Sequence, residues 1–132
     1  MGTEGKSAFR AGGGAMGARV RVFDWASTSL GDIATWSPAM RATVDTALMS
    51  GFPMALFFGP DLICIHNDAF TPILGSKPDA LGVSFRETWA EAWAALKPIV
   101  DLALAGETTY LEDHPVQIER FGVMQECYFT FS

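Results

Sequence analysis

Hydrophobic residues are most concentrated between Pro53 and Gly75, where two short apolar runs are separated by a turn. Residues 54–58 and 62–66 are rich in the aliphatic, aromatic and β-branched side chains that favour strands. Gly59-Pro60-Asp61 lies between them. It has the composition of a tight turn, because proline fixes φ and glycine tolerates positive φ. The pattern therefore predicts a β-hairpin.

A helix is predicted on each side of this hairpin. Before it, Ser37-Pro38 supplies an N-cap and a proline for the first helical position, and the pattern ends at Ser50-Gly51. One face of this helix is apolar, with a hydrophobic residue at every fourth position: Met40, Val44 and Leu48. After the hairpin, Asn67-Asp68 can cap a short helix that stops at Gly75.

Helical and strand-like patterns also occur in the second half of the chain. Residues 77–82 predict one helical turn. Tryptophan and aliphatic residues around Pro98 predict two helices that meet there, because proline interrupts the helical hydrogen-bond ladder, and Gly106 ends the second helix. Residues 109–119 and 123–131 predict two strands. In the last strand both faces carry bulky side chains, so we expect both to be covered.

This order of elements resembles a PAS domain, the sensory module of many bacterial signalling proteins. The shared features are an apolar strand, a turn, a strand ending in Asn, a short helix and Leu-Gly, which read here Leu56-Phe57-Phe58, Gly59-Pro60-Asp61, Ile63-Cys64-Ile65-His66-Asn67, Asp68-Ala69-Phe70 and Leu74-Gly75. The order continues to the strand-like tail 126–131, so the resemblance covers about residues 50–132.

The resemblance implies an α+β fold with five antiparallel strands and helices packed on one face of the sheet. The sequence allows the placement of strands at 54–58, 62–66, 109–119 and 123–131, so the last strand of the family is expected to be missing. We therefore expect the chain to be a fragment of a longer protein.

The segment before the hairpin sharpens the resemblance. It resembles the segment that precedes PAS domains in a group of bacterial sensor histidine kinases, through Asp24-Trp25, Ser29-Leu30-Gly31 and Trp36-Ser37-Pro38. The expected organisation is a disordered, glycine-rich leader at 1–20, an N-terminal helical extension at 21–51 and a PAS domain at 52–132 that is truncated at its C-terminal strand.

The resemblance also predicts which side chains of the second hairpin strand point toward the core. In the family, the Asn that closes this strand points inward. Alternation then places Ile63 and Ile65 toward the core. The residues that face outward are Leu62, Cys64 and His66. We expect the apolar face of the helix at 37–50 to cover them.

Composition and charge exclude several classes of protein. The chain has 132 residues, 49% of them hydrophobic, which suits one domain with a sizeable core. Its apolar runs are far shorter than the roughly 20 residues that cross a bilayer, and we expect no secretory signal, because no apolar stretch follows Lys6 and Arg10. Residues 1–21 carry a net charge of +3 and residues 22–132 carry −9, so we expect no binding to nucleic acid. Two cysteines cannot build a disulfide framework, so we expect a cytoplasmic protein with reduced thiols.

Three motifs with possible chemistry are weak. Residues 12–17 match G-x-G-x-x-G, but no hydrophobic strand precedes them, which argues against dinucleotide binding. Cys64 and His66 share a strand face without a second ligand pair at metal spacing, so we favour packing over a metal site. Asp113 and His114 form a candidate acid–base pair next to a proline, where a solvated polar cluster is the commoner arrangement. We expect no catalytic residue.

Trp89 and Trp93 are spaced to form an aromatic ridge on one helix face. The ridge is expected in the core and also in the wall of a ligand cavity, because PAS pockets lie between the sheet and the middle helices. The expected lining residues are Phe58, Ile65, Asn67, Trp89, Trp93, Val100 and Tyr128. No cofactor is expected, since 84–93 lacks the cysteine of flavin-binding PAS domains and 97–106 lacks the proximal histidine of haem-binding ones.

The sequence therefore predicts a sensory or regulatory PAS input module of a bacterial signalling protein, with a histidine kinase as the expected parent. It would bind a small ligand or mediate dimerisation and perform no catalysis itself. Two alternatives remain: a ligand-free interaction module, and a small α+β lyase or isomerase that uses Asp113 and His114. The expected partners are a second copy of the chain and a downstream effector domain, with neither nucleic acid nor a membrane.

Overall fold

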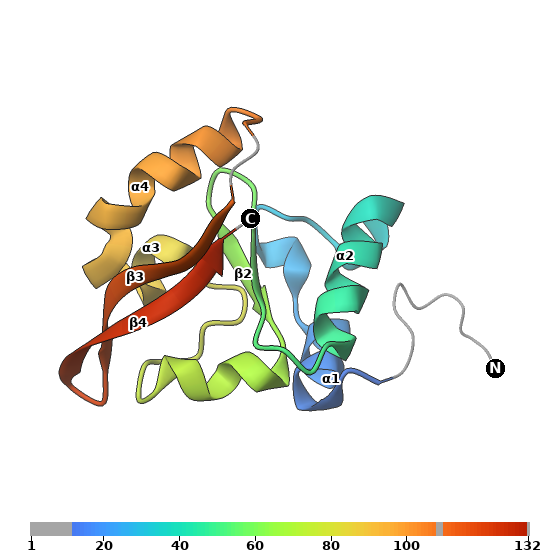
Figure 1. The fold of residues 1–132 in the computed structure, drawn as a ribbon. Coiled ribbons are helices and arrows are strands. Elements are labelled where there is room, and N and C mark those ends of the chain that lie inside the picture. The colour runs from blue at the N-terminus through green and yellow to red at the C-terminus, as the bar shows by residue number, and fades with distance from the viewer. Residues whose placement is uncertain (1–11, 108–109, 132) are drawn as a thin grey trace.

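The computed structural model describes residues 12–107 and 110–131 (Figure 1). The helices and strands follow the order α1 (Gly14–Val22), η1 (Trp25–Ser27), η2 (Ile33–Thr35), α2 (Pro38–Met49), β1 (Ala55–Phe58), β2 (Ile63–His66), η3 (Asp68–Leu74), α3 (Phe85–Thr88), α4 (Ala90–Leu104), β3 (Leu111–Arg120) and β4 (Val123–Phe131). The expected α+β class is confirmed. Within the described ranges, every helix is too short or too polar to cross a membrane.

Both predicted pairs of strands form. β1 pairs antiparallel with β2, with Leu56 opposite Ile65, and β3 pairs antiparallel with β4, with Val116 opposite Cys127. Among the described residues these pairs are two separate two-stranded sheets, not one continuous sheet. The far edge of β2 is also occupied, because Cys64 exchanges backbone hydrogen bonds with the segment at residues 82–83.

β2 lies between two layers of helices, with α1 and α2 on one side and α3 and α4 on the other (Figure 1). We call the first layer the N-terminal core; its buried residues are Met16, Val20, Trp25, Trp36, Val44, Leu48, Ile63, Ile65 and Leu81. The second layer is the C-terminal core, with buried residues Leu62, Cys64, Phe70, Leu74, Ala80, Phe85, Trp89, Ala92, Leu96, Val116 and Ile118.

The expected cover for β2 is therefore wrong in its assignment of faces. The apolar face of α2 forms as predicted, but it packs on Ile63 and Ile65. Leu62 and Cys64 instead face the C-terminal core. The two faces were reversed in the prediction because it assumed that one of them is an outer face. Helices lie on both faces of β2, so both are buried.

Local sequence signals correctly placed two helix starts. Ser37 caps α2 by accepting a hydrogen bond from the Met40 amide at 3.1 Å. Asn67 caps η3 by accepting from the Phe70 amide at 3.0 Å, and Gly75 ends this helix as predicted. η3 is a 3₁₀ helix rather than an α-helix.

Two predictions about helices fail. Residues 77–82 are not helical, because Asp79 accepts from the Leu81 amide and Gly82 pairs with β2. α4 continues through Pro98, since Pro98 and Ala94 are exposed and water can satisfy the Ala94 carbonyl that loses its helical donor. The chain breaks instead at Trp89, which separates α3 from α4 with φ −115° and ψ 38°.

The expected disordered leader at 1–20 is wrong for residues 14–20, which belong to α1. Met16 and Val20 are buried in the N-terminal core and so anchor this helix. Residues 1–11 lie outside the described residues.

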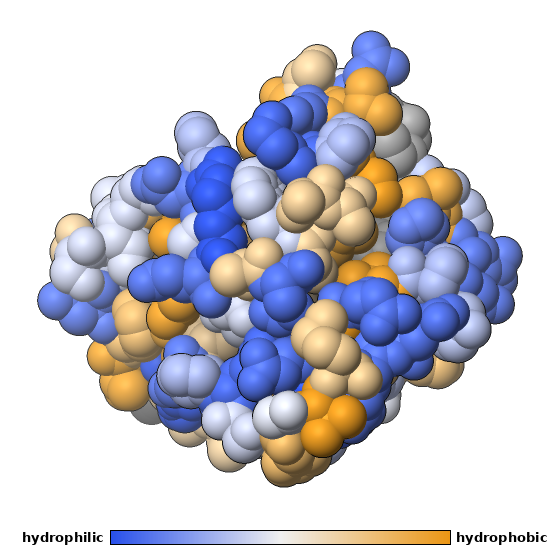
Figure 2. All heavy atoms as spheres, turned by 90° about the vertical axis from the view of Figure 1, so that its left-hand side faces the viewer, coloured by the Kyte–Doolittle hydropathy of each residue, from blue (hydrophilic) through white to orange (hydrophobic). Residues whose placement is uncertain are grey.

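The outer face of the β3–β4 hairpin is exposed, although we expected both faces of β4 to be covered. Cys127 and Phe129 pack against the C-terminal core, whereas Met124 and Tyr128 point away from it and are 52% and 62% exposed. Figure 2 shows the side of the molecule that carries this hairpin and α4, where apolar residues are interspersed with hydrophilic ones.

Asn67, at the end of β2, joins three elements through its buried side chain. Its Oδ1 atom accepts from the Met54 amide at 3.1 Å and also caps η3. Its Nδ2 atom donates to carbonyls at the end of α2 and in the following loop: Ala47 at 2.9 Å, Ser50 at 3.2 Å and Phe52 at 2.6 Å. The amide thus fixes the path of the chain from α2 into β1.

We predict that Asn67→Ala lowers the free energy of unfolding by about 3–5 kcal/mol, because buried backbone donors and acceptors lose their partner. Urea denaturation measures this change. Gln117→Ala is the control, since the Gln117 amide is exposed, and it should change stability by less than about 0.5 kcal/mol. Equal effects of the two substitutions would contradict the role of Asn67.

Candidate ligand-binding site

The candidate site is the half-buried border of the C-terminal core. Its buried centre is bordered by apolar side chains that are only half-buried. They come mainly from β1, α4 and β4: Ala55, Phe57, Ile73, Trp93, Ile99, Val100, Cys127 and Phe129. Half-buried apolar side chains around a packed centre are the type of surface that a small apolar molecule can cover.

Aromatic rings form the wall of this site. The Phe57 and Phe85 rings meet edge to face with centroids 5.0 Å apart, and the Trp93 ring lies 5.8 Å from Phe85. Phe70 and Trp89 form another edge-to-face pair at 6.3 Å. These contacts restrict the rings to definite orientations, so the wall is preformed.

Two cations cover the outer side of the tryptophans. The Arg86 guanidinium lies 4.8 Å from the centroid of the Trp93 ring, and the Lys77 ammonium lies 5.2 Å from that of Trp89. Both cation–π contacts help to fix the positions of the indole rings.

The strands beside the site have unpaired edges in the described part of the chain. β1 has no neighbouring strand besides β2, and β4 has none besides β3. The inward side chains of both strands, Phe57 on β1 and Cys127 and Phe129 on β4, contact the same core. The two edges therefore border one apolar region.

The structure brings together only part of the predicted pocket. Trp89, Trp93 and Val100 all belong to the C-terminal core. Phe58 and Ile65 lie across β2 in the N-terminal core, because alternation places them on the opposite face.

Two further predicted residues do not line the site. Asn67 is buried but its side chain is committed to backbone groups. Tyr128 is on the exposed outer face of the hairpin, where its hydroxyl donates to Glu126 at 2.9 Å. This hydrogen bond and the Glu126 charge raise the pKa of the Tyr128 hydroxyl.

Sequence reasoning missed the rings that complete the wall, namely Phe57, Phe70 and Phe85. Phe57 is the neighbour of the predicted Phe58, so a correct assignment of strand faces would have identified it. Phe85 directly follows Ser84, which caps α3 by accepting from the Arg86 amide at 3.2 Å. The Ser84 cap is a local signal that could have placed Phe85 on a buried first turn.

Cys64 and His66 do not form a metal centre. Within the described ranges, no group of three or more His, Cys, Asp or Glu residues is placed to hold an ion. Burial, helped by the negative charge of Asp79, raises the pKa of the Cys64 thiol to about 12. His66 is buried against Phe70, and its Nδ1 atom lies 2.9 Å from the Asn67 carbonyl oxygen. Both residues are parts of the core.

Asp113 and His114 are neighbours in the irregular first part of β3. Asp113 is exposed, with a φ of 52°, where the register of the hairpin shifts between Leu111 and His114. His114 is half-buried and lies opposite Phe129.

A polar contact fastens α4 to the β3–β4 hairpin beside the site. The Lys77 ammonium and the Glu91 carboxylate are 2.7 Å apart and largely buried, and Glu91 also accepts from the Glu119 amide at 2.9 Å. Burial by itself would raise the pKa of Glu91, but the Lys77 hydrogen bond, the Glu119 amide and the Lys77 charge together lower it.

We predict that Glu91→Gln destabilises the protein at pH 7 by about 1–2 kcal/mol, because the amide keeps the hydrogen bonds but loses the charge. A carboxylate with a lowered pKa stabilises the fold above its ordinary pKa of 4.5, and this contribution disappears as pH falls through the folded value. The variant should therefore lose less stability on acidification, as measured by urea denaturation between pH 7 and 3.

Asp101→Asn is the matched control for this experiment. It removes an ion pair with Lys97 in which both side chains are more than half exposed, so its effect at pH 7 should stay below about 0.5 kcal/mol. If Glu91→Gln behaves like this control at every pH, the charge of Glu91 does not help to hold α4 against its neighbours.

The chain was also compared with known proteins. No family model, no curated protein and no solved structure matches it. The assignment of function therefore depends on the residues and their geometry.

Proposed function

We propose that this chain is a sensory or regulatory input module whose C-terminal core binds a small, mainly apolar molecule. One observation carries the proposal: half-buried apolar side chains from β1, α4 and β4 surround a rigid wall of aromatic rings. Apolar surface that is ordered but incompletely covered is suited to a ligand that completes its burial.

We further propose that the fold is that of a PAS domain. The order of the elements from β1 to β4 supports this proposal, as does the placement of the unpaired edges of β1 and β4 beside one core. In the PAS family a fifth strand joins the corresponding edges. A strand in that position here would unite the two hairpins into one antiparallel sheet and would close one side of the site.

The proposed setting is a bacterial signal-transduction protein, with a histidine kinase as the effector and a homodimer as the working unit. This part of the proposal rests on the resemblance of residues 50–132 and of the segment before them to such proteins. A cytoplasmic location is proposed as well, and it is supported by two cysteines that are both free thiols.

Signalling in this proposal uses packing instead of catalysis. A ligand that fits the C-terminal core in one arrangement of the helices and strands shifts the population toward that arrangement. Filling an apolar cavity changes stability by about 1–4 kcal/mol, which is enough to shift a balanced two-state equilibrium substantially. Movement of α4 relative to the β3–β4 hairpin is the proposed output, because these elements form two sides of the site.

A second candidate function is a ligand-free interaction module. The exposed apolar residues of the β3–β4 hairpin favour it: Met124 and Tyr128 lie on its outer face, and Phe121 and Val123 lie in or next to its turn. Exposed apolar residues on one side of a sheet can serve as a contact surface for a second copy or another protein.

We predict that Trp93→Ala weakens binding of the ligand by at least about tenfold, because truncation of a central aromatic ring removes more contact energy than loss of a peripheral group. The ligand is first identified by mass spectrometry of material released from the natively purified protein. Binding to each variant is then measured by calorimetry, and in the full-length protein Trp93→Ala should also alter signalling output.

Tyr128→Ala is the matched control, since it removes an exposed aromatic ring on the outer face of the hairpin. His114→Ala tests the enzymatic alternative and should change output little. Loss of dimer in Tyr128→Ala, together with no small molecule released from the wild-type protein, would favour the interaction module. Loss of output in His114→Ala with Trp93→Ala intact would contradict the sensory site.

A further inference from the structure

The glycine-rich segment at residues 12–17 has a structural role that its sequence motif does not indicate. Gly12, Gly13 and Gly14 all have positive φ, at 114°, 78° and 67°, and α1 starts at Gly14 without a side-chain cap of its own. Its first amides are capped from a distant part of the chain. Ala15 N and Met16 N donate to the two carboxylate oxygens of Asp68, at 3.0 and 2.8 Å.

The glycines make room for this contact. A Cβ atom on Gly14 would lie 1.9 Å from Oδ2 of Asp68, and one on Gly17 would lie 2.3 Å from the Gly12 carbonyl oxygen. The positive end of a helix attracts a negative group, and the glycines allow the carboxylate to approach the backbone closely. The position that a bound phosphate occupies in a dinucleotide-binding loop is filled here by a side chain of the same chain.

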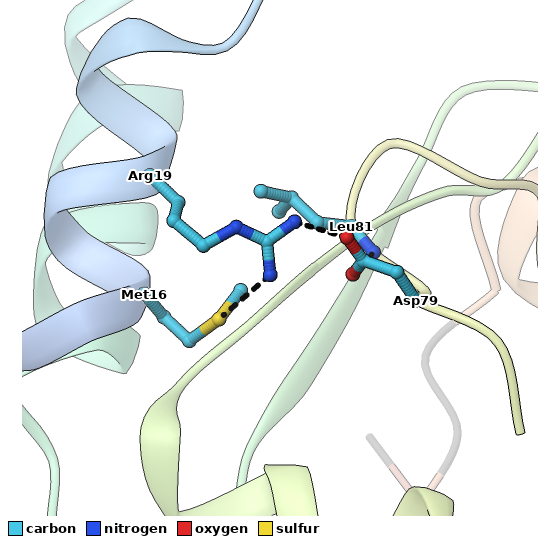
Figure 3. A network of polar contacts seen from close by, with 4 residues as sticks. All are labelled: Met16, Arg19, Asp79 and Leu81. Carbon is cyan, nitrogen blue, oxygen red and sulfur yellow. Dashed lines mark hydrogen bonds and ion pairs between the residues drawn. The ribbon is translucent and has the colours of Figure 1, made fainter. Parts of the chain in front are cut away.

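A second carboxylate holds the same helix. Arg19 extends from α1 to Asp79 and forms an ion pair with it, while the other guanidinium nitrogen lies 3.6 Å from the Met16 sulfur (Figure 3). Burial alone would raise the pKa of Asp79, but its contacts with Arg19 and with the Leu81 amide lower it. Asp79 is therefore ionised at neutral pH and available to Arg19.

Both carboxylates belong to one segment, residues 68–82, that reaches every layer of the molecule. Asp68 begins η3 and Asp79 follows it, so the segment contacts α1 at two points. Between these points Phe70 and Leu74 enter the C-terminal core, and directly after the second point Leu81 enters the N-terminal core. The contacts of α1 are thus attached to the segment that also packs beside the aromatic wall.

Besides these contacts, α1 is held by the burial of Met16 and Val20 in the N-terminal core. It has nine residues, fewer than the roughly 12–15 that an isolated helix needs to be even marginally stable in water. Its large buried side chains are Met16 and Val20, and Val22 is 82% exposed. A helix of this length depends on its tertiary contacts, and those made by the carboxylates of Asp68 and Asp79 are electrostatic.

We propose that α1 is an electrostatic latch, held by Asp68 at its N-terminus and by Asp79 through Arg19. When these contacts are lost, α1 unfolds and detaches while β2 and the C-terminal core remain folded. The latch does not require the proposed ligand. If the sensory function holds, a ligand at the aromatic wall would move the segment at 68–82. This movement would change the contacts of Asp68 and Asp79 with α1 and so control the latch.

Hydrogen exchange and limited proteolysis of the whole chain test the latch. In Asp68→Ala and in Asp79→Ala, the amides of residues 14–22 should exchange roughly tenfold faster than in the wild type, because a helix loses its capping or end-fixing contact. Trypsin should cleave after Arg21 faster by a similar factor. Exchange at Ile63–His66 of β2 should not change. Raising the ionic strength of the wild-type protein should accelerate exchange at 14–22 in the same way, since salt screens both contacts.

Asp101→Ala is the matched control, because it removes a carboxylate from an ion pair on α4 and leaves α1 untouched. It should leave exchange at residues 14–22 unchanged. Faster exchange in β2 by the same factor as in α1 would show that α1 is an integral part of the fold, and the latch would be wrong. Unchanged exchange at 14–22 in both Asp68→Ala and Asp79→Ala would also overturn the proposal.

Discussion

The burial of β2 on both faces is the constraint on which the rest of the structure depends. A strand of only four residues has all of them buried. It must therefore receive a layer of side chains from each side, and α2 with the N-terminal segment supplies one while α3, α4 and the β3–β4 hairpin supply the other. Its two edges are also occupied, by β1 and by residues 82–85. Asn67 then fixes the end of the strand to α2 and η3.

The candidate site follows from this arrangement. Because Leu62 and Cys64 face the C-terminal core, the middle helices and the hairpin must gather on that side. The centre of this core is packed, whereas its border between β1, α4 and β4 is only half covered. Charged groups lie around the core instead of inside it, with Glu91 bound to Lys77 and Asp79 to Arg19. The interior thus offers apolar contacts, and the Lys77–Glu91 ion pair lies beside it.

Elements defined by neighbouring residues could be predicted from the sequence. The hairpins, the start of α2 at Ser37 and the cap of η3 at Asn67 all depend on residues within a few positions of each other. α1 could not be found in this way, because its cap comes from Asp68, more than fifty positions away. The continuity of α4 through Pro98 also escaped prediction, since it depends on the exposure of that side of the helix.

The site was predictable only in part for a related reason. Helical spacing correctly grouped Trp89 and Trp93, which lie on one helix and share the C-terminal core. Alternation in a strand gives two sets of residues but does not say which set faces which layer. For β2 the two sets of residues were assigned to the opposite faces. Ile65 and Phe58 were therefore expected at the site, although they belong to the N-terminal core, and Phe57 of the C-terminal core was overlooked. Tyr128 was misplaced because the outer face of the hairpin has no cover.

The central claim is that β2 unites the two cores into one cooperative unit, and native-state hydrogen exchange of Val44→Ala tests it most directly. Val44 is fully buried in the N-terminal core, and its truncation should cost about 2 kcal/mol. The account predicts that the free energy of opening falls by the same amount at slowly exchanging amides of α2 and of α4, on opposite sides of β2. A decrease confined to α2, with α4 unchanged, would contradict it.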